Sequence, residues 1–236
     1  MIDIQQLIEL DQQVLLTLNG YNSLFWDGFM WTVTKTATWI PVAAALLYVI
    51  FKNNKVSQAV TILFLLALCI TLSDQFASGL CKPYFARFRP AQDPDLMYLV
   101  HIVNGYRGGQ FGFISSHAAN TFTVATFIAL LVRNHLMTFM MFLWAMIASY
   151  SRIYLGVHYP GDILCGALSG TCIALIVYAI YHYVYGKKVS QPRYISTQYT
   201  SSGFTVGDMA PFHLTLLLTY FYAIIAGMVR AKDLYF

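Results

Sequence analysis

Long apolar stretches alternate with short polar connections along most of the chain. A helix needs about 20 apolar residues to cross the hydrocarbon layer of a bilayer, and open loops or sheet edges are not tolerated there because every backbone group needs an internal partner. Six runs approach this length: residues 37–51, 56–80, 118–132, 136–150, 163–185 and 212–229. The pattern therefore predicts an all-α fold, a polytopic transmembrane helical bundle of about six spans.

The N-terminal segment has a different pattern. Leu7, Leu10, Val14 and Leu18 recur at helical spacing in an otherwise polar stretch, which is typical of an amphipathic helix lying in the membrane interface. Acidic residues replace the basic start of a secretory signal peptide, and no small-residue cleavage site follows, so we expect the spans themselves to target the chain.

The absence of a polar linker indicates a single membrane-embedded domain over residues 1–236. We expect it to comprise an interfacial segment at 1–35, a core at 36–185, and a C-terminal loop with an extra span at 186–236. The last run is the least regular, because residues 203–212 would also suit a reentrant or surface helix.

Composition narrows the classes of protein. Only 10% of the residues are charged and 58% are hydrophobic, whereas soluble domains have about 25% charged residues. These values exclude a disordered chain and a soluble enzyme with a charged surface. The net charge of +4 does not indicate a nucleic-acid partner, because the basic residues form no long cluster. Four cysteines lie in or beside apolar runs and outside metal-binding patterns, so we expect them to be packing residues: Cys69, Cys81, Cys165 and Cys172.

The connections between spans differ in charge. Those after the first, third and fifth spans are KNNK at 52–55, RNH at 133–135 and GKKVSQPR at 186–193, with six basic residues and no acidic one. Cytoplasmic loops are enriched in Lys and Arg, so these three loops are predicted to face the cytoplasm. The N-terminus and the segments at 81–113 and 152–162 then face the outside, which is the periplasm for a bacterial cytoplasmic (inner) membrane.

Three polar segments stand at span ends on this outer side. They are KPYFARFRP at 82–90, GFISSHAAN at 112–120 and SRIYLGVHYPGD at 151–162. Each alone has a structural explanation: cations that reach from a helix end to the headgroups, a serine that only caps a helix, and a structural histidine. Their combination on one side of the membrane indicates a shared site for a phosphate group.

Phosphate chemistry requires the residue types that these segments supply. Arg side chains hold phosphate oxygens through two parallel hydrogen bonds, and Lys acts as a point charge. A neutral imidazole attacks phosphorus when a carboxylate holds its other N–H, and a second imidazole can protonate the leaving oxygen. Unpaired N–H groups at a helix start also bind anions. The residues therefore suit phosphoryl transfer in which fixed cations neutralise the charge without a metal.

At these positions the chain resembles the type-2 phosphatidic acid phosphatase superfamily of membrane lipid phosphatases, which also includes vanadium haloperoxidases. Lys82, six intervening residues and Arg89-Pro90 match the first motif of the family. Ser151-Arg152, five residues, His158, three residues and Asp162 match its third motif. Such spacing is specific, and the resemblance covers roughly residues 26–185.

The second motif departs from the family pattern. It usually reads Pro-Ser-Gly-His, whereas this chain has Ile114-Ser115-Ser116-His117. Ser and His are kept, so the resemblance still implies a phosphate-binding hydroxyl and an acid here, while the backbone restraints of Pro and Gly are changed.

The resemblance implies a role for each matching residue. His158 would be the nucleophile that forms a phosphohistidine, Asp162 would orient it, and His117 would be the general acid. Phosphate would be bound by five residues, with Ser116 contributing its backbone N–H: Lys82, Arg89, Ser115, Ser116 and Arg152. Second choices are Arg87, Asn120 and Asp74. No metal or cofactor is implied.

The implied function is a metal-independent phosphatase that removes a terminal phosphate from a membrane lipid phosphate or pyrophosphate at the outer face. A lipid phosphate lies at the depth of the span ends, where the polar segments stand. The loop-poor outer surface slightly favours undecaprenyl pyrophosphate or lipid A phosphate, with phosphatidylglycerol phosphate and phosphatidic acid as alternatives. Two other classes stay open: a phospholipid-binding or transport protein that does not cleave its ligand, and a vanadate-dependent peroxidase, which fits six spans poorly.

Overall fold

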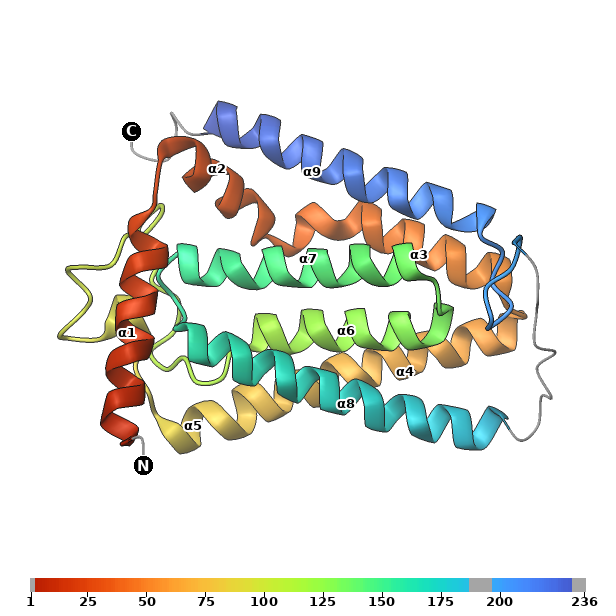
Figure 1. Cartoon of the computed structure of the whole chain (residues 1–236), viewed down its shortest axis with the longest axis horizontal. Helices are drawn as coiled ribbons and strands as arrows, with labels where there is room; N and C mark the ends of the chain where they lie inside the picture. The colour runs from red at the N-terminus through yellow and green to blue at the C-terminus, as the bar shows by residue number, and fades with distance from the viewer. Residues whose placement is uncertain (1–2, 187–196, 231–236) are drawn as a thin grey trace.

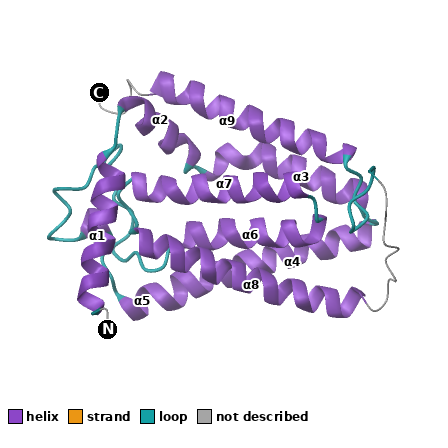
Figure 2. Ribbon diagram, in the orientation of Figure 1, coloured by secondary structure: helices purple, strands orange, loops and turns teal. Residues whose placement is uncertain are grey.

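A computed structural model describes residues 3–186 and 197–230. These residues form a bundle of roughly aligned helices with one helix lying across its end (Figure 1). Figure 2 shows helices and loops and no strand in this part of the chain. The α-helices are α1 (Ile4–Gly20), α2 (Leu24–Val33), α3 (Ile40–Asn53), α4 (Val56–Asp74), α5 (Lys82–Phe85), α6 (Ser116–Val132), α7 (His135–Tyr154), α8 (Pro160–Gly186) and α9 (Ala210–Arg230). Shorter or wider helical turns are η1 (Thr36–Trp39), η2 (Gln75–Cys81), η3 (Pro90–Gln92) and η4 (Gly207–Met209).

All six apolar runs form helices, which confirms the predicted all-α transmembrane bundle. Among the described residues, five helical stretches are long and apolar enough to cross a membrane: Thr36–Asn53, Val56–Phe85, His135–Tyr154, Pro160–Tyr183 and Gly207–Arg230. The sixth, α6, has 17 residues and is shorter than this criterion. It begins deeper in the bundle than the neighbouring ends of α7 and α8 (Figure 1), so the polar segment before it enters the protein. The last run, α9, packs along α2 and α3 and is a full-length helix, not a surface turn.

The N-terminal segment consists of two helices with different positions. α1 lies across the end of the bundle (Figure 1), buries Leu15 and Asn19, and leaves Leu7, Leu10 and Val14 exposed, as an amphipathic interfacial helix would. Its position in a membrane interface stays a prediction. By contrast, α2 enters the bundle and packs against α9, so only part of the segment at 1–35 has the predicted amphipathic arrangement.

The centre of the bundle is α6, which contacts α4, α7 and α8. Its contact with α8 is close because α8 presents Gly166 and Gly170 one turn apart, and small residues at this spacing let two helix backbones approach. A Cβ atom at Gly170 would lie 2.1 Å from the Ala119 carbonyl oxygen, and one at Gly166 would lie 2.6 Å from that of Ser115. This contact fixes the start of α6 against the start of α8.

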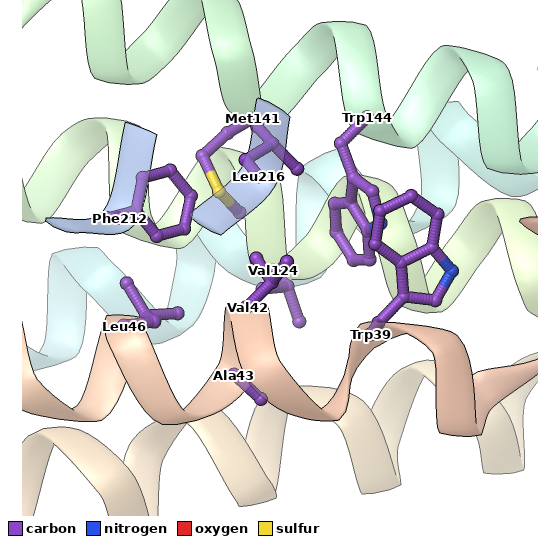
Figure 3. Close-up of a pocket in the computed structure, with 9 residues that line it drawn as sticks. All are labelled: Trp39, Val42, Ala43, Leu46, Val124, Met141, Trp144, Phe212 and Leu216. Carbon is purple, nitrogen blue, oxygen red and sulfur yellow. The ribbon is translucent and has the colours of Figure 1, made fainter. Parts of the chain in front are cut away.

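Figure 3 shows the side chains that line an apolar cavity between helices. Its volume is about 90 Å³, and no residue of the three polar segments lines it. Its lining comes from η1, α3, α6, α7 and α9: Trp39, Val42, Ala43, Leu46, Val124, Met141, Trp144, Phe212 and Leu216. The two indoles meet edge to face with ring centroids 5.9 Å apart. No titratable side chain lines this cavity, so it offers no group for acid–base or nucleophilic chemistry.

The two ends of the bundle separate the predicted cytoplasmic loops from the polar segments. The α3–α4 and α6–α7 connections lie at the end opposite α1 (Figure 1). Of the predicted cytoplasmic cations, Lys52, Lys55 and Arg133 belong to these connections, whereas those at 187–193 lie outside the described residues. The division of the helix ends into two groups agrees with the loop charges, and which end faces the cytoplasm stays a prediction.

Candidate active site

The three polar segments meet at the end of the bundle that carries α1. The candidate residues come from the ends of four helices and from the loops beside them: α5 and the following loop, the start of α6, the last turn of α7, and the α7–α8 connection with the first turn of α8. The cations of Arg89, Arg152 and Lys82 all lie close enough to His158 to act on it electrostatically. Segments as far apart in sequence as Arg87 and Asp162, which are separated by 75 residues, therefore form one site.

A histidine and a carboxylate form the centre of this site. His158 Nδ1 lies 3.1 Å from Asp162 Oδ2, and both side chains are buried. Pro160, two residues after the histidine, begins α8, a position where its missing N–H is harmless. His158 and Asp162 are four residues apart, so they lie about one helical turn from each other. The Tyr159 N–H donates to the same carboxylate oxygen at 3.0 Å. The carboxylate is thereby fixed against one nitrogen of the imidazole.

The other imidazole nitrogen faces a cation. Arg89 Nη1 lies 3.2 Å from His158 Nε2, and because a guanidinium only donates, Nε2 is assigned as the acceptor and Nδ1 as the protonated nitrogen. Burial lowers the pKa of His158 well below its ordinary value, and the charges of Arg89 and Arg152 lower it further. The imidazole is therefore neutral at physiological pH, and the lone pair of its unprotonated nitrogen faces Arg89.

Arg89 is held by the backbone. It donates through Nε to the Phe111 carbonyl at 3.1 Å and through Nη1 to the Val157 carbonyl at 3.4 Å. Gly112 lies between this arginine and Asp162: a Cβ there would be 3.1 Å from Arg89 Cγ and 3.1 Å from Asp162 Oδ2. A Cβ at position 112 would therefore require Arg89 or Asp162 to shift by a few tenths of an ångström.

The start of α6 supplies hydroxyl groups. Ser115 is its N-cap: the hydroxyl accepts from the Ala118 N–H at 3.5 Å, and its own N–H donates to the Asp162 carbonyl at 3.0 Å. Ser115 therefore caps the helix, which is the structural explanation that the sequence allowed, and a phosphate-binding role stays a proposal. The next hydroxyl, that of Ser116, accepts from Lys82 Nζ and lies 2.8 Å from the Ser78 hydroxyl, so the lysine is directed at the helix start.

Arg152 is buried at the end of α7. Its guanidinium donates to the Thr34 hydroxyl and to the Tyr106 hydroxyl, the latter at 3.2 Å. Its Nε and the Asn120 Oδ1 are both buried and have no hydrogen-bond partner within the described part of the chain. Unpaired buried polar atoms are rare in proteins, and these two belong to helices that border the site.

His117 lies in the first turn of α6 and is partly buried. The charges of Arg152, Arg89 and Lys82 and the imidazole of His158 are close enough to act on it. The two histidines therefore belong to one electrostatic cluster, as the sequence predicts.

Of the three second choices, Arg87 has the clearest position. It lies between two carboxylates, with Nη2 2.8 Å from Asp11 and Nη1 3.3 Å from Asp162, so its charge is used within the protein. Asp74 is close enough to Lys82 to act on it, and Asn120 has the unpaired oxygen described above.

Sequence reasoning missed the supporting residues. They are Asp11, Thr34, Ser78, Tyr106 and Gly112. Ser78 stands four residues before Lys82, and its hydroxyl oxygen accepts a hydrogen bond from Lys82 Nζ at 3.1 Å, so helical spacing alone would have identified it. The others approach from distant segments. Among the described residues no group of three His, Cys, Asp or Glu side chains is arranged for a metal, and all four cysteines are free.

The chain is similar in sequence to a known protein family and to two phosphatases. Residues 59–185 match a family model described as the PAP2 superfamily, a range that contains all three polar segments. The lipid A 4′-phosphatase of Bacteroides thetaiotaomicron is 42% identical over 180 residues, which is 76% of this chain and 80% of that protein. The lipid A 4′-phosphatase of Porphyromonas gingivalis is 36% identical over 181 residues, 76% of each protein.

A solved structure shares the fold. The crystal structure of Aquifex aeolicus LpxE is similar with a TM-score of 0.55 and 26% identity, covering 71% of this chain and 93% of that one.

Proposed function

The chain belongs to the PAP2 superfamily, and from this membership and the site geometry we propose that it removes the 4′-phosphate of lipid A by way of a phosphohistidine. It is a multi-pass membrane protein and a lipid phosphatase. The similarity to two lipid A 4′-phosphatases over three quarters of the chain supports the substrate. The single observation that supports this chemistry is the buried His158–Asp162 pair, with Arg89 at the unprotonated imidazole nitrogen.

Binding of the phosphate group uses the three cations. Arg89 and Arg152 would hold phosphate oxygens as planar donors and Lys82 as a point charge. The backbone N–H of Ser116 at the start of α6 and the hydroxyl of Ser115 would add donors at a helix N-terminus, where anions bind favourably. With Arg89 Nη1 3.2 Å from Nε2, an oxygen bound to this guanidinium brings phosphorus next to the nucleophile.

Catalysis then proceeds in two steps. His158 Nε2 attacks phosphorus while Asp162 stabilises the imidazolium through Nδ1–H, and His117 gives a proton to the departing sugar oxygen. Water, activated by His117, next hydrolyses the phosphohistidine and releases inorganic phosphate. The fixed cations neutralise the charge on the transferring group in both steps, so turnover should not require an added metal.

The site is expected to face the periplasm. The described basic connections between spans lie at the opposite end of the bundle (Figure 1), and basic loops face the cytoplasm. A site at a helix-bundle end meets a lipid phosphate at headgroup depth, with acyl chains beside the helices. The bacterial inner membrane fits this arrangement.

The test is phosphate release from four purified lipids in detergent with EDTA present. Lipid A should lose its 4′-phosphate and keep its 1-phosphate, as seen by mass spectrometry, and should be hydrolysed faster than undecaprenyl pyrophosphate, phosphatidylglycerol phosphate and phosphatidic acid. A faster reaction with another of the four would reassign the substrate. Lipid binding without release from any of them would support a non-catalytic protein and contradict the proposal.

Two controls define the chemistry. His158→Ala should abolish release while keeping lipid binding, because the cations remain. Activity that EDTA removes and Mg²⁺ restores would contradict the metal-independent mechanism.

A further inference from the structure

Helix α1 contributes a carboxylate next to the catalytic pair. Asp11 is only 14% exposed in its side chain, although it lies on a helix whose other acidic residue, Glu9, is exposed. Its Oδ2 lies 2.8 Å from Arg87 Nη2, and its Oδ1 accepts the Gly161 N–H at 2.7 Å. Asp11 therefore contacts the residue just before Asp162 and the arginine that faces it.

Arg87 transmits this contact to the active-site carboxylate. Its Nη1 lies 3.3 Å from Asp162 Oδ1, and its guanidinium lies over the Tyr159 ring at 3.8 Å from the centroid. The Tyr159 hydroxyl donates in turn to Asp93 at 2.9 Å. An arginine packed on a ring and lying between two carboxylates within ion-pair distance has little freedom to move, so its position depends on these partners.

Both oxygens of the buried Asp162 carboxylate are thus defined by neighbours. Oδ2 accepts from the Tyr159 N–H and faces His158 Nδ1, and Oδ1 faces Arg87. The rotation of the carboxylate about its side-chain bond sets how well Oδ2 meets the imidazole. A shift of Arg87 would rotate the carboxylate and misdirect the nucleophilic nitrogen of His158.

We propose that Asp11 and Arg87 are positioning residues that orient Asp162, and through it the His158 nucleophile, so that α1 is a working part of the active site. This inference rests on the proposed phosphatase function. Neither residue touches the phosphate: their contribution lies in the geometry of the attack. Small displacements at a reacting centre cost as much as about 100-fold in rate.

The test compares Asp11→Asn with Glu9→Gln, which removes the same charge from the exposed face of the same helix. Asp11→Asn should lower kcat by about 10- to 100-fold with KM and the inhibition constant of inorganic phosphate unchanged, because the phosphate-binding cations stay in place. Asp11→Glu, which keeps the carboxylate, should retain more activity than Asp11→Asn. Glu9→Gln should behave as the wild type.

A second background tests whether the two residues act as one unit. In Arg87→Gln protein, the further change Asp11→Asn should have little additional effect, because coupled residues are not additive. Thermal unfolding of each variant is measured alongside. A loss of kcat in a variant that keeps the wild-type Tm then cannot be attributed to poor folding.

The outcomes separate this inference from the function on which it rests. Wild-type kcat in Asp11→Asn, a rise in KM alone, or full additivity with Arg87→Gln would overturn the positioning role while leaving the phosphatase intact. An inactive wild-type protein with all four lipids would instead overturn the proposed function.

Discussion

Substitution of Gly170 by alanine tests whether the close contact between α6 and α8 holds the site together. In the structure a Cβ at this position would lie 2.1 Å from the Ala119 carbonyl oxygen and 2.8 Å from the Thr123 hydroxyl. Ordinary contact begins at 3.4 Å, so the first distance is about 1.3 Å too short. Both colliding groups belong to neighbouring turns of α6. The closer one is a backbone carbonyl, which cannot rotate away as a side chain could.

The magnitude follows from this overlap. The two helices must separate by roughly 1 Å, and overpacking of this kind costs about 1–3 kcal/mol. The Thr123 hydroxyl would also lose its 2.8 Å hydrogen bond to the Gly170 carbonyl, worth about 0.6 kcal/mol between membrane helices. Since α6 carries Ser115 and His117 while α8 carries Asp162, the same separation should reduce kcat by about 10- to 100-fold.

The assay is thermal unfolding of purified protein in detergent, combined with phosphate release from lipid A. Gly170→Ala should lower Tm by roughly 5 °C and reduce turnover. The matched control is Gly20→Ala at the end of α1, where a Cβ would meet nothing within 4 Å and no change in activity is expected. Gly170→Ala protein with wild-type Tm and kcat would refute the reasoning.

Further predictions concern the catalytic groups. Arg89→Lys should lower kcat/KM by about 100-fold or more, because an ammonium cannot make the forked contacts of a guanidinium, and a steady-state assay showing near-normal kcat/KM would exclude the predicted role. Because the pKa of His158 lies well below its ordinary value, the neutral nucleophile persists as pH falls, so kcat/KM corrected for titration of the substrate phosphate should not decline through the ordinary histidine range near pH 6.5. A one-proton titration near pH 6.5 that NMR assigns to the His158 imidazole would contradict that. Asp27→Asn should lower Tm with little effect on kcat. Asp27 accepts from the Tyr154 hydroxyl at 2.6 Å and lies 2.8 Å from His101, and neither partner is a proposed catalytic or phosphate-binding residue; a large loss of kcat would contradict this.

Local sequence rules accounted for the helices and for the central pair. Apolar runs bounded by polar connections predicted the six helices, and the family membership suggested by the motif spacing is confirmed. His158 and Asp162 are four residues apart, at the start of a helix that begins at Pro160, and this spacing predicts that they pair. Few backbone torsions separate two residues within one helical turn, so their sequence spacing predicts whether their side chains meet.

Long-range contacts could not be predicted in this way. Asp11 and Gly161 are 150 residues apart, and nothing in the amphipathic pattern of α1 distinguishes the buried Asp11 from the exposed Glu9. The same applies to Thr34, which meets Arg152 only because α2 enters the bundle. The sequence makes Arg87 a second choice for phosphate binding, whereas its position between two carboxylates depends on where α1 lies.

The depth at which α6 begins in the bundle also depends on long-range contacts. Sequence hydropathy placed its apolar run at 118–132, and the helix begins at Ser116, so its start was nearly correct. Its depth in the bundle depends on how residues 86–115 enter the protein, which no local pattern specifies. The glycine at 112 matters for the same reason: its neighbours Arg89 and Asp162 come from two other segments.

The most direct test of the central claim is to trap the covalent intermediate. Enzyme mixed with lipid A carrying a radiolabelled 4′-phosphate and quenched rapidly in alkali should contain an acid-labile, base-stable phosphohistidine, located by peptide mapping at His158 and absent from His158→Ala. Label on another residue, or full turnover by His158→Ala without labelled protein, would contradict the mechanism.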